Sequence, residues 1–169
     1  MITLEQKHLA LLDEARQRGQ TDIGNLRLCF ELLTLAAAID RDCAARLAPH
    51  QLSEGKFVLL FLLRDRPDGL SPHELAERAG VTRATITGLL DGLERDGFLA
   101  RNAMAEDRRR VAVRLTGKGE EMAATLFQEH TRWIDTLLAD LSDDEQRVLS
   151  GLLRRVWLAT DSGSGDRTA

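Results

Sequence analysis

One stretch near the middle of the chain, residues 71–97, constrains the fold most, because it marks the ends of two short helices. It reads SPHELAERAGVTRATITGLLDGLERDG. Ser71 and Glu74 form a capping-box pattern at the start of the first helix, with a proline at its first position. Gly80 ends that helix after about two turns, and Thr82 can cap the next one. The pattern predicts a helix, a tight glycine turn and a second helix.

A hairpin pattern follows directly after Gly97, which is placed to end the second helix. Val111, Val113 and Leu115 alternate with other residues, and this period of two is typical of a strand. We therefore expect a short strand over 98–101, a polar loop over 102–107 and a returning strand over 110–115. Two helices followed by such a hairpin are the layout of a winged helix-turn-helix, within a mostly α chain that carries one small β-hairpin wing.

Longer amphipathic helices flank this unit. We expect helices over 4–18, 22–47 and 53–63, a long helix from Thr116, and a last helix that begins with a capping box at Ser142. Apolar residues along 22–47 form two adjacent stripes, which are too wide for an ordinary surface helix. That helix is therefore expected to pack on more than one neighbour or on a second subunit.

Composition and charge restrict the class of protein. The 169 residues are 43% hydrophobic, which is enough to form a core. The formal net charge is −4, yet residues 101–118 hold six basic and two acidic residues, so a positive segment stands in an acidic chain. No secretory signal is evident, and the longest apolar run, 57–63, is far shorter than the roughly 20 residues that span a membrane. We expect a cytoplasmic protein without membrane association.

The second helix of the central unit has a face suited to a DNA groove. The inward residues at 100° spacing are Ile86, Leu89, Leu90 and Leu93; the outward ones are Ala84, Gly88, Asp91 and Arg95, flanked by Thr85 and Thr87. The threonine hydroxyls can bond phosphates or base edges, and Gly88 permits close approach. Arg83 is suited to reading guanine through two hydrogen bonds. At the two helix N-termini beside Ser71 and Thr82, free backbone N–H groups can point at phosphates.

Three consecutive arginines stand at the predicted hairpin tip. Arg109 can enter the minor groove while Asp107, two residues earlier, orients its guanidinium. Arg108 and Arg110 can then point toward phosphates. Taken alone, such a charge run is more typical of a solvated loop than of a binding site. Its place between a helix-turn-helix and a returning strand favours the wing interpretation.

The stretch SPHELAERAGVTRATITGLLDGLERDGFLARNAMAEDRRRVAVRLTGKG resembles the MarR-type transcriptional regulators, including the Asp107-x-Arg109 pair and the Leu115-Thr116-x-x-Gly119 exit. With the flanking helices, the resemblance covers about residues 22–158. It implies a homodimer, two winged helices on a pseudo-palindromic operator, usually repression, and release by a small ligand or by thiol oxidation. Many members have an arginine at the position of Gly88, so base reading here should depend more on Arg83, the threonines and the wing.

The resemblance also suggests how the chain is divided. We expect an N-terminal helical extension at 1–20, helical dimerisation regions at 21–50 and 117–158, the DNA-binding winged helix at 51–116 and a disordered tail at 159–169. In the family, effectors lie where the dimerisation helices meet the winged helix and are often small aromatic acids. Arg46 and His50, near the first interhelical loop, could meet such a carboxylate, although surface solvation explains both residues equally well.

Other residues have weaker claims to a sensing role. The segment around Cys29 resembles the one that carries the reactive cysteine in hydroperoxide-sensing members, but the tyrosines that accompany it there are absent, because this chain has no tyrosine. Cys29 and Cys43 are more simply interpreted as small apolar helix residues. His130 falls in an apolar stripe and is expected in a core or a dimer seam.

We therefore expect a homodimeric transcriptional regulator that acts as a repressor and whose partners are double-stranded DNA, a second copy and a small-molecule effector. The alternatives are a thiol-based oxidant sensor of the same fold that uses Cys29, and a winged-helix protein-interaction module without DNA affinity. No metal-ligand pair, phosphate loop or nucleophile-base set supports an enzyme, a metal site or a cofactor.

Overall fold

The computed structural model describes residues 2–103 and 111–164. The elements are α1 (Gln6–Gln17), α2 (Gly24–Leu47), the 3₁₀ helix η1 (Ala48–His50), α3 (Glu54–Leu63), α4 (Pro72–Ala79), α5 (Arg83–Arg95), β1 (Leu99–Ala103), β2 (Val111–Leu115), α6 (Gly117–Leu138), α7 (Asp143–Trp157) and α8 (Asp161–Ser164). The chain forms two compact units, residues 1–123 and 124–169.

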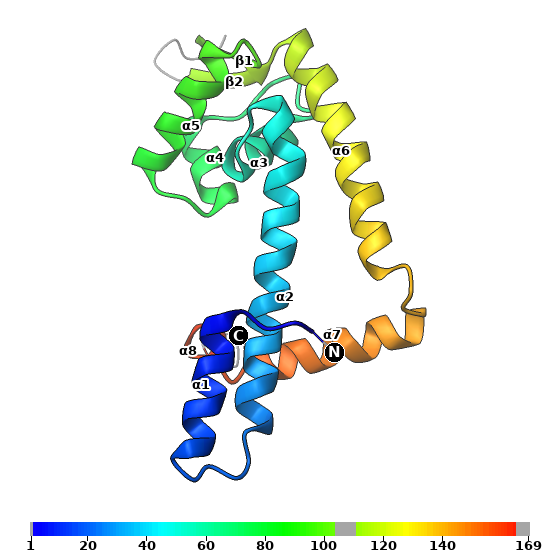
Figure 1. Ribbon diagram of the computed structural model, residues 1–169. Coiled ribbons are helices and arrows are strands. Elements are labelled where there is room, and N and C mark those ends of the chain that lie inside the picture. The colour runs from blue at the N-terminus through cyan, green and yellow to red at the C-terminus, as the bar shows by residue number, and fades with distance from the viewer. Residues whose placement is uncertain (1, 104–110, 165–169) are drawn as a thin grey trace. The chain divides into compact units, whose positions relative to one another are not determined.

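The winged-helix core is built from α3, α4, α5 and the hairpin, which lie together in Figure 1. Side chains from every one of these elements are almost completely buried, among them Leu59, Leu60, Leu63, Leu75, Ile86, Leu90, Leu93 and Val113. β1 and β2 pair antiparallel, with Leu99 opposite Leu115. Leu70, in front of α4, exchanges backbone hydrogen bonds of 3.1 and 2.8 Å with Val113, so the hairpin is held against the helices.

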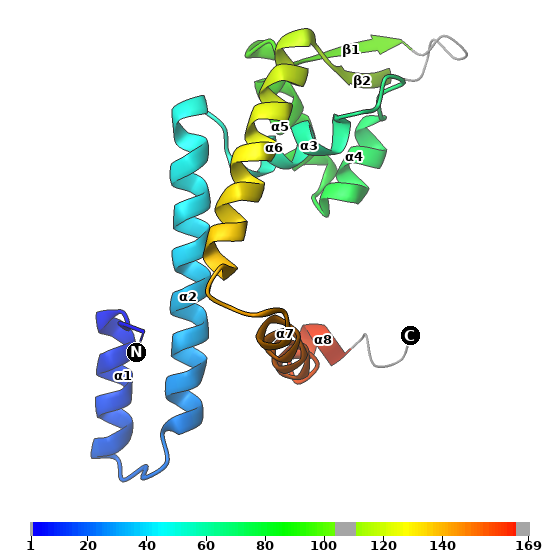
Figure 2. The ribbon, with the colours of Figure 1, turned by 90° about the vertical axis from the view of Figure 1, so that its right-hand side faces the viewer.

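The N-terminal helix α1 lies alongside the first half of α2 (Figure 2). Leu4, Leu12 and Phe30 form the buried contact, and the His8 ring stacks on Phe30 at 4.5 Å. The helix begins at Gln6 with Glu5 as its N-cap, two residues later than the sequence predicted. Burial of Leu4 explains the difference, because the extended residues before the helix also pack on α2.

Apolar side chains remain exposed along α2, as its second stripe suggested. Leu28, Leu35 and Ile39 share one side of the helix and are 55%, 46% and 38% exposed. In the second unit, α7 exposes a similar face that consists of Val148, Leu149, Leu152, Leu153, Val156 and Trp157. Large apolar faces of this kind mark interaction surfaces.

The second unit begins within α6, where the His130 ring meets the Trp133 ring edge-on at 4.9 Å. The predicted capping box of α7 is present, because Ser142 and Glu145 bond each other's backbone amides.

Residues 161–164, which we expected in a disordered tail, instead form the short helix α8. The Thr160 hydroxyl accepts a hydrogen bond of 3.1 Å from the amide of Gly163 and so stabilises this turn. Residues 165–169 lie outside the described residues. No helix among those described is long and apolar enough to cross a membrane.

Candidate nucleic-acid interface

Two capped helix starts organise the interface. Ser71 accepts a hydrogen bond of 3.2 Å from the amide of Glu74, and the Glu74 carboxylate accepts one of 2.8 Å from the amide of Ser71. Gly80 ends α4 in the left-handed conformation, at φ +65°, which glycine adopts without strain. Thr82 then caps α5 by accepting a bond of 3.2 Å from the amide of Thr85. The local signals in the sequence thus set the predicted helix-turn-helix.

The inner and outer faces of α5 agree with the predicted helical spacing. Of the predicted inward residues, Ile86, Leu90 and Leu93 are buried and Leu89 is half-buried. The predicted outward residues are exposed, as is Arg83: Ala84, Gly88, Asp91 and Arg95, with the flanking Thr85 and Thr87. A Cβ added at Gly88 would have no atom within 4 Å, so nothing in the protein fills the space above this residue. The exposed face is small and polar, which permits close approach to a groove floor.

The threonine hydroxyls on α5 are oriented by the helix itself. Thr87 donates a hydrogen bond of 2.9 Å to the carbonyl of Arg83, and the hydroxyls of Thr82 and Thr85 lie 2.9 Å apart. Because the proton of Thr87 is engaged, the remaining lone pairs of its oxygen are available to accept. In a major groove the matching donors are the amino groups of adenine and cytosine.

An open groove of about 570 Å³ runs between the start of α4 and α5. Its lining includes Ser71 and His73 at the start of α4, Arg83 and Thr87 of α5, and Val111 of β2. The lining therefore comes from the predicted phosphate-binding helix start at Ser71, from the first turns of α5 and from the first residue of β2. Sequence reasoning missed His73; its only signal was its place in the first turn of α4.

The predicted wing-tip residues Asp107, Arg108, Arg109 and Arg110 lie outside the described residues. The structure describes the other three members of the basic segment, Arg101, Arg114 and Lys118, and two of them make polar contacts within the protein. Arg101 forms ion pairs with Asp91 and Glu94 of α5, and Lys118 donates a bond of 2.7 Å to the carbonyl of Asp96. The local positive excess counted from the sequence therefore overstates the charge available to a partner.

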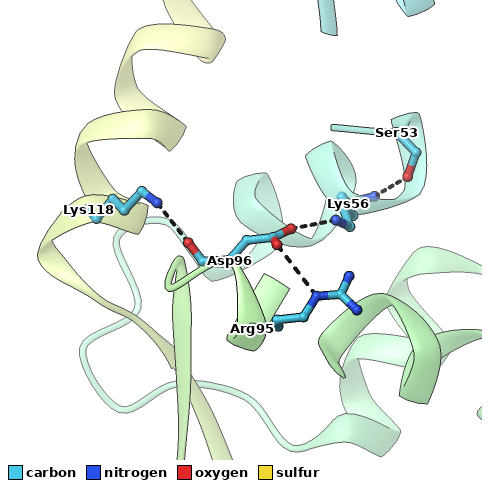
Figure 3. Close-up of polar contacts among 5 residues, drawn as sticks. All are labelled: Ser53, Lys56, Arg95, Asp96 and Lys118. Carbon is cyan, nitrogen blue, oxygen red and sulfur yellow. Dashed lines mark hydrogen bonds and ion pairs between the residues drawn. The ribbon is translucent and has the colours of Figure 1, made fainter. Parts of the chain in front are cut away.

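A polar junction fixes the end of α5 (Figure 3). The Lys56 ammonium of α3 lies 2.7 Å from the Asp96 carboxylate, and Arg95 lies 3.7 Å from it. The hydrogen bond from Lys56, followed by the attraction of Lys56, Arg95 and Lys118, lowers the pKa of Asp96 from its usual value. The Ser53 hydroxyl caps α3 by accepting from the amide of Lys56.

The two residues predicted to meet an effector are in different settings. His50 lines a cavity of about 380 Å³ together with Phe98, Lys118 and Met122. Arg46 is exposed and donates a bond of 3.2 Å to the carbonyl of Asp42 in its own helix, and the cavity lining does not include it. Asp96 also lines this cavity, and the Lys118 ammonium already bonds the Asp96 carbonyl and lies 4.3 Å from the centre of the Phe98 ring, so an acidic ligand would have to compete for that cation.

The two cysteines differ in exposure. Cys29 is exposed on α2, whereas Cys43 is half-buried. Burial, followed by the charges of Glu54 and Asp40, raises the pKa of the Cys43 thiol. A raised pKa disfavours the reactive thiolate. Among the described residues, no group of three or more histidine, cysteine or acidic side chains could hold a metal ion.

Comparison with known proteins agrees with this geometry. The MarR family model matches residues 52–111. The chain is 36% identical over 167 residues, 94% of its own length and all of the relative's, to the HTH-type transcriptional repressor YetL of Bacillus subtilis (strain 168).

Two solved structures share the fold. The PcaV transcriptional regulator from Streptomyces coelicolor, in complex with its natural ligand, is 29% identical, with a TM-score of 0.59 over 75% of this chain and 91% of that one. The S. aureus MepR–DNA complex is 23% identical, with a TM-score of 0.65 over 76% and 96%. The predicted fold, mostly helical with a two-stranded wing, is confirmed.

Proposed function

The chain belongs to the MarR family of DNA-binding transcriptional regulators, and from this premise we propose that it is a homodimeric repressor that leaves a pseudo-palindromic operator when a small aromatic acid binds. The observation that carries the proposal is the exposed, small and polar face of α5, with Arg83 in its first turn and open space above Gly88. Its relatives are named as transcriptional regulators, and the chain is a regulator rather than an enzyme.

Each finer part of the proposal has its own support. YetL, which this chain matches over the whole of YetL's length, is named as a repressor, and this favours repression. The exposed apolar faces of α2 and α7 favour a second copy as partner. The cavity beside His50 and Lys118 is our candidate effector site. The relatives are bacterial, so we place the action of the protein in the cytoplasm, where a bacterial chromosome lies.

DNA contact is assigned to three groups of residues. Ser71 and Thr82 would direct the amides of their helix starts at phosphates. Arg83, Thr85, Thr87 and Gly88 would face the major groove. The wing residues Arg108, Arg109 and Arg110, with Asp107 as the orienting carboxylate, would grip the backbone and the minor groove.

Selection of duplexes from a random-sequence pool tests the proposal. We expect an enriched site with two-fold symmetry, because a symmetric dimer presents two identical recognition helices. The selected site, placed over a promoter, should reduce transcription in vitro when the protein is added. Failure to enrich any sequence would contradict sequence-specific binding and favour the protein-interaction module.

A thiol sensor remains a second candidate, because Cys29 is exposed. Under organic hydroperoxide the parent protein should then leave the selected duplex, while Cys29→Ser stays bound. Equal behaviour of parent and variant would remove Cys29 from the mechanism. Cys43→Ser is the matched control, since its thiol has a raised pKa and should not react.

A further inference from the structure

Arg101 links the wing to α5, the helix proposed to enter the major groove and called the recognition helix below. It lies in β1, and its guanidinium is 2.6 Å from the carboxylate of Asp91 and 3.3 Å from that of Glu94, both on α5. The amide of Arg101 also donates a bond of 3.3 Å to Glu94. The Arg101 side chain is 29% exposed, against 57% for Asp91 and 40% for Glu94. A single arginine therefore pairs with two carboxylates, each of which is more exposed than the arginine itself.

The two carboxylates stand where they would oppose DNA. Asp91 follows Thr87 by one helical turn, so both residues lie on the same outward side of α5. An ionised carboxylate on that side would repel the phosphate backbone at close range, where little salt screens the interaction. Without a compensating cation, the recognition helix would carry two such charges into the interface.

We infer that Arg101 is a positioning residue for DNA binding: it offsets one of the two negative charges of Asp91 and Glu94 at the DNA surface and fixes the base of the wing against α5. It acts through these partners rather than by touching DNA, because both terminal nitrogens of its guanidinium already face carboxylates. The inference rests on the proposed function, since it requires that this side of α5 meets a duplex.

The ion pairs are not needed to hold the domain together. Pairs between partly exposed side chains contribute little to folding, and the buried core beneath them does not depend on charge. Removing Arg101 should therefore change DNA affinity much more than it changes the melting temperature. This difference separates a role at the interface from a general role in folding.

A double-mutant cycle tests the inference, with affinities measured by fluorescence anisotropy on a duplex selected by the parent protein. The four proteins are the parent, Arg101→Gln, Asp91→Asn/Glu94→Gln and the triple variant. In the parent background, Arg101→Gln should weaken binding about 5- to 10-fold at low salt, because it leaves Asp91 and Glu94 uncompensated beside the phosphates. In the background without the carboxylates, the same change should alter the Kd by less than about 2-fold.

Arg95→Gln is the matched control, because it removes the same charge from the exposed side of α5 but its carboxylate partner is Asp96. Its effect should be similar in both backgrounds. Arg101→Lys keeps one charge without the two-pronged contact and should bind with intermediate affinity; it also serves if the glutamine variant does not fold.

The outcomes separate this inference from the proposed function. An equal weakening by Arg101→Gln in both backgrounds would mean that Arg101 contacts DNA directly and would overturn its positioning role. Unchanged affinity in both backgrounds would overturn the inference as well, while leaving DNA binding by the parent intact. A parent protein that binds no duplex would instead contradict the proposed function.

Discussion

Lys56 and Asp96 form an ion pair of 2.7 Å that joins the first turn of α3 to the C-cap of α5. Gly92 leaves room for the lysine side chain, because a Cβ there would lie 2.8 Å from Cε of Lys56 and would make that side chain shift. Lys118 bonds the carbonyl of the same aspartate from the start of α6. The end of the recognition helix is thus fixed by charges from two other helices.

The pH dependence of stability should report this junction. Because the contact with Lys56 lowers the pKa of Asp96 in the folded state, the ionised carboxylate stabilises the fold above about pH 3.9, its unfolded value. That contribution disappears as the pH falls through the lowered folded pKa. Asp96→Asn should therefore melt below the parent at pH 5 to 8, as followed by circular dichroism at about 222 nm.

The control for this change is Asp13→Asn, which breaks an exposed pair with Arg16 and should have little effect. The difference in melting temperature between the parent and Asp96→Asn should shrink as the pH falls below about 3.9. A gap that stayed constant down to acid pH would attribute the effect to packing instead of charge.

Gly119 should be intolerant of any side chain. A Cβ there would collide with the backbone carbonyl of Phe98, and that carbonyl accepts a hydrogen bond of 3.0 Å from Thr116. Moving the Phe98 carbonyl away from residue 119 would strain this bond. Gly119→Ala should therefore lower the free energy of unfolding by about 2 kcal/mol or more in urea titrations. Gly117→Ala, which meets no atom within 4 Å, should not; equal destabilisation by the two changes would refute the steric cause.

Stability and DNA affinity should change in opposite directions in Gly88→Ala. The position is helical, exposed and open, so alanine should stabilise the fold by roughly 0.5–1 kcal/mol. Its methyl group would stand between α5 and the base edges and should weaken operator binding. Gly92→Ala is the comparison: it forces Lys56 to move and should stabilise less. A stabilised Gly88→Ala with unchanged affinity would exclude close approach at this position.

The parts of this structure that could be predicted from the sequence are those set by local signals. Capping residues such as Ser71 and Ser142, and the apolar spacing of α5, act within a few residues of chain, so their effects could be predicted from the sequence. The contacts of Arg101 and Lys118 could not, because they join residues that only the fold brings together. The same limit applies to Lys56 and Asp96, which are 40 residues apart.

The wing prediction can be tested by removing its charge. Arg108→Ala/Arg109→Ala should lower operator affinity by more than about tenfold, and the slope of log affinity against log salt should shrink by roughly 0.9 for each phosphate that the protein no longer neutralises. Arg16→Ala/Arg18→Ala, on the exposed side of α1, removes the same charge and should leave both quantities nearly unchanged. Unchanged binding in the wing variant would refute the role of these arginines.

The exposed stripe of α2 should determine the oligomeric state. Leu28, Leu35 and Ile39 are too exposed for a chain that acts alone, and burying them against a second copy would remove apolar surface from water. Leu35→Glu places a charge in the middle of that stripe, so it should shift the mass measured by light scattering from dimer to monomer. Ala45→Glu adds the same charge to an exposed position of α2 outside the stripe and should remain dimeric. Because dimerisation follows mass action, the shift should be largest at low protein concentration. A Leu35→Glu protein that stayed dimeric at every concentration would exclude this stripe from the interface.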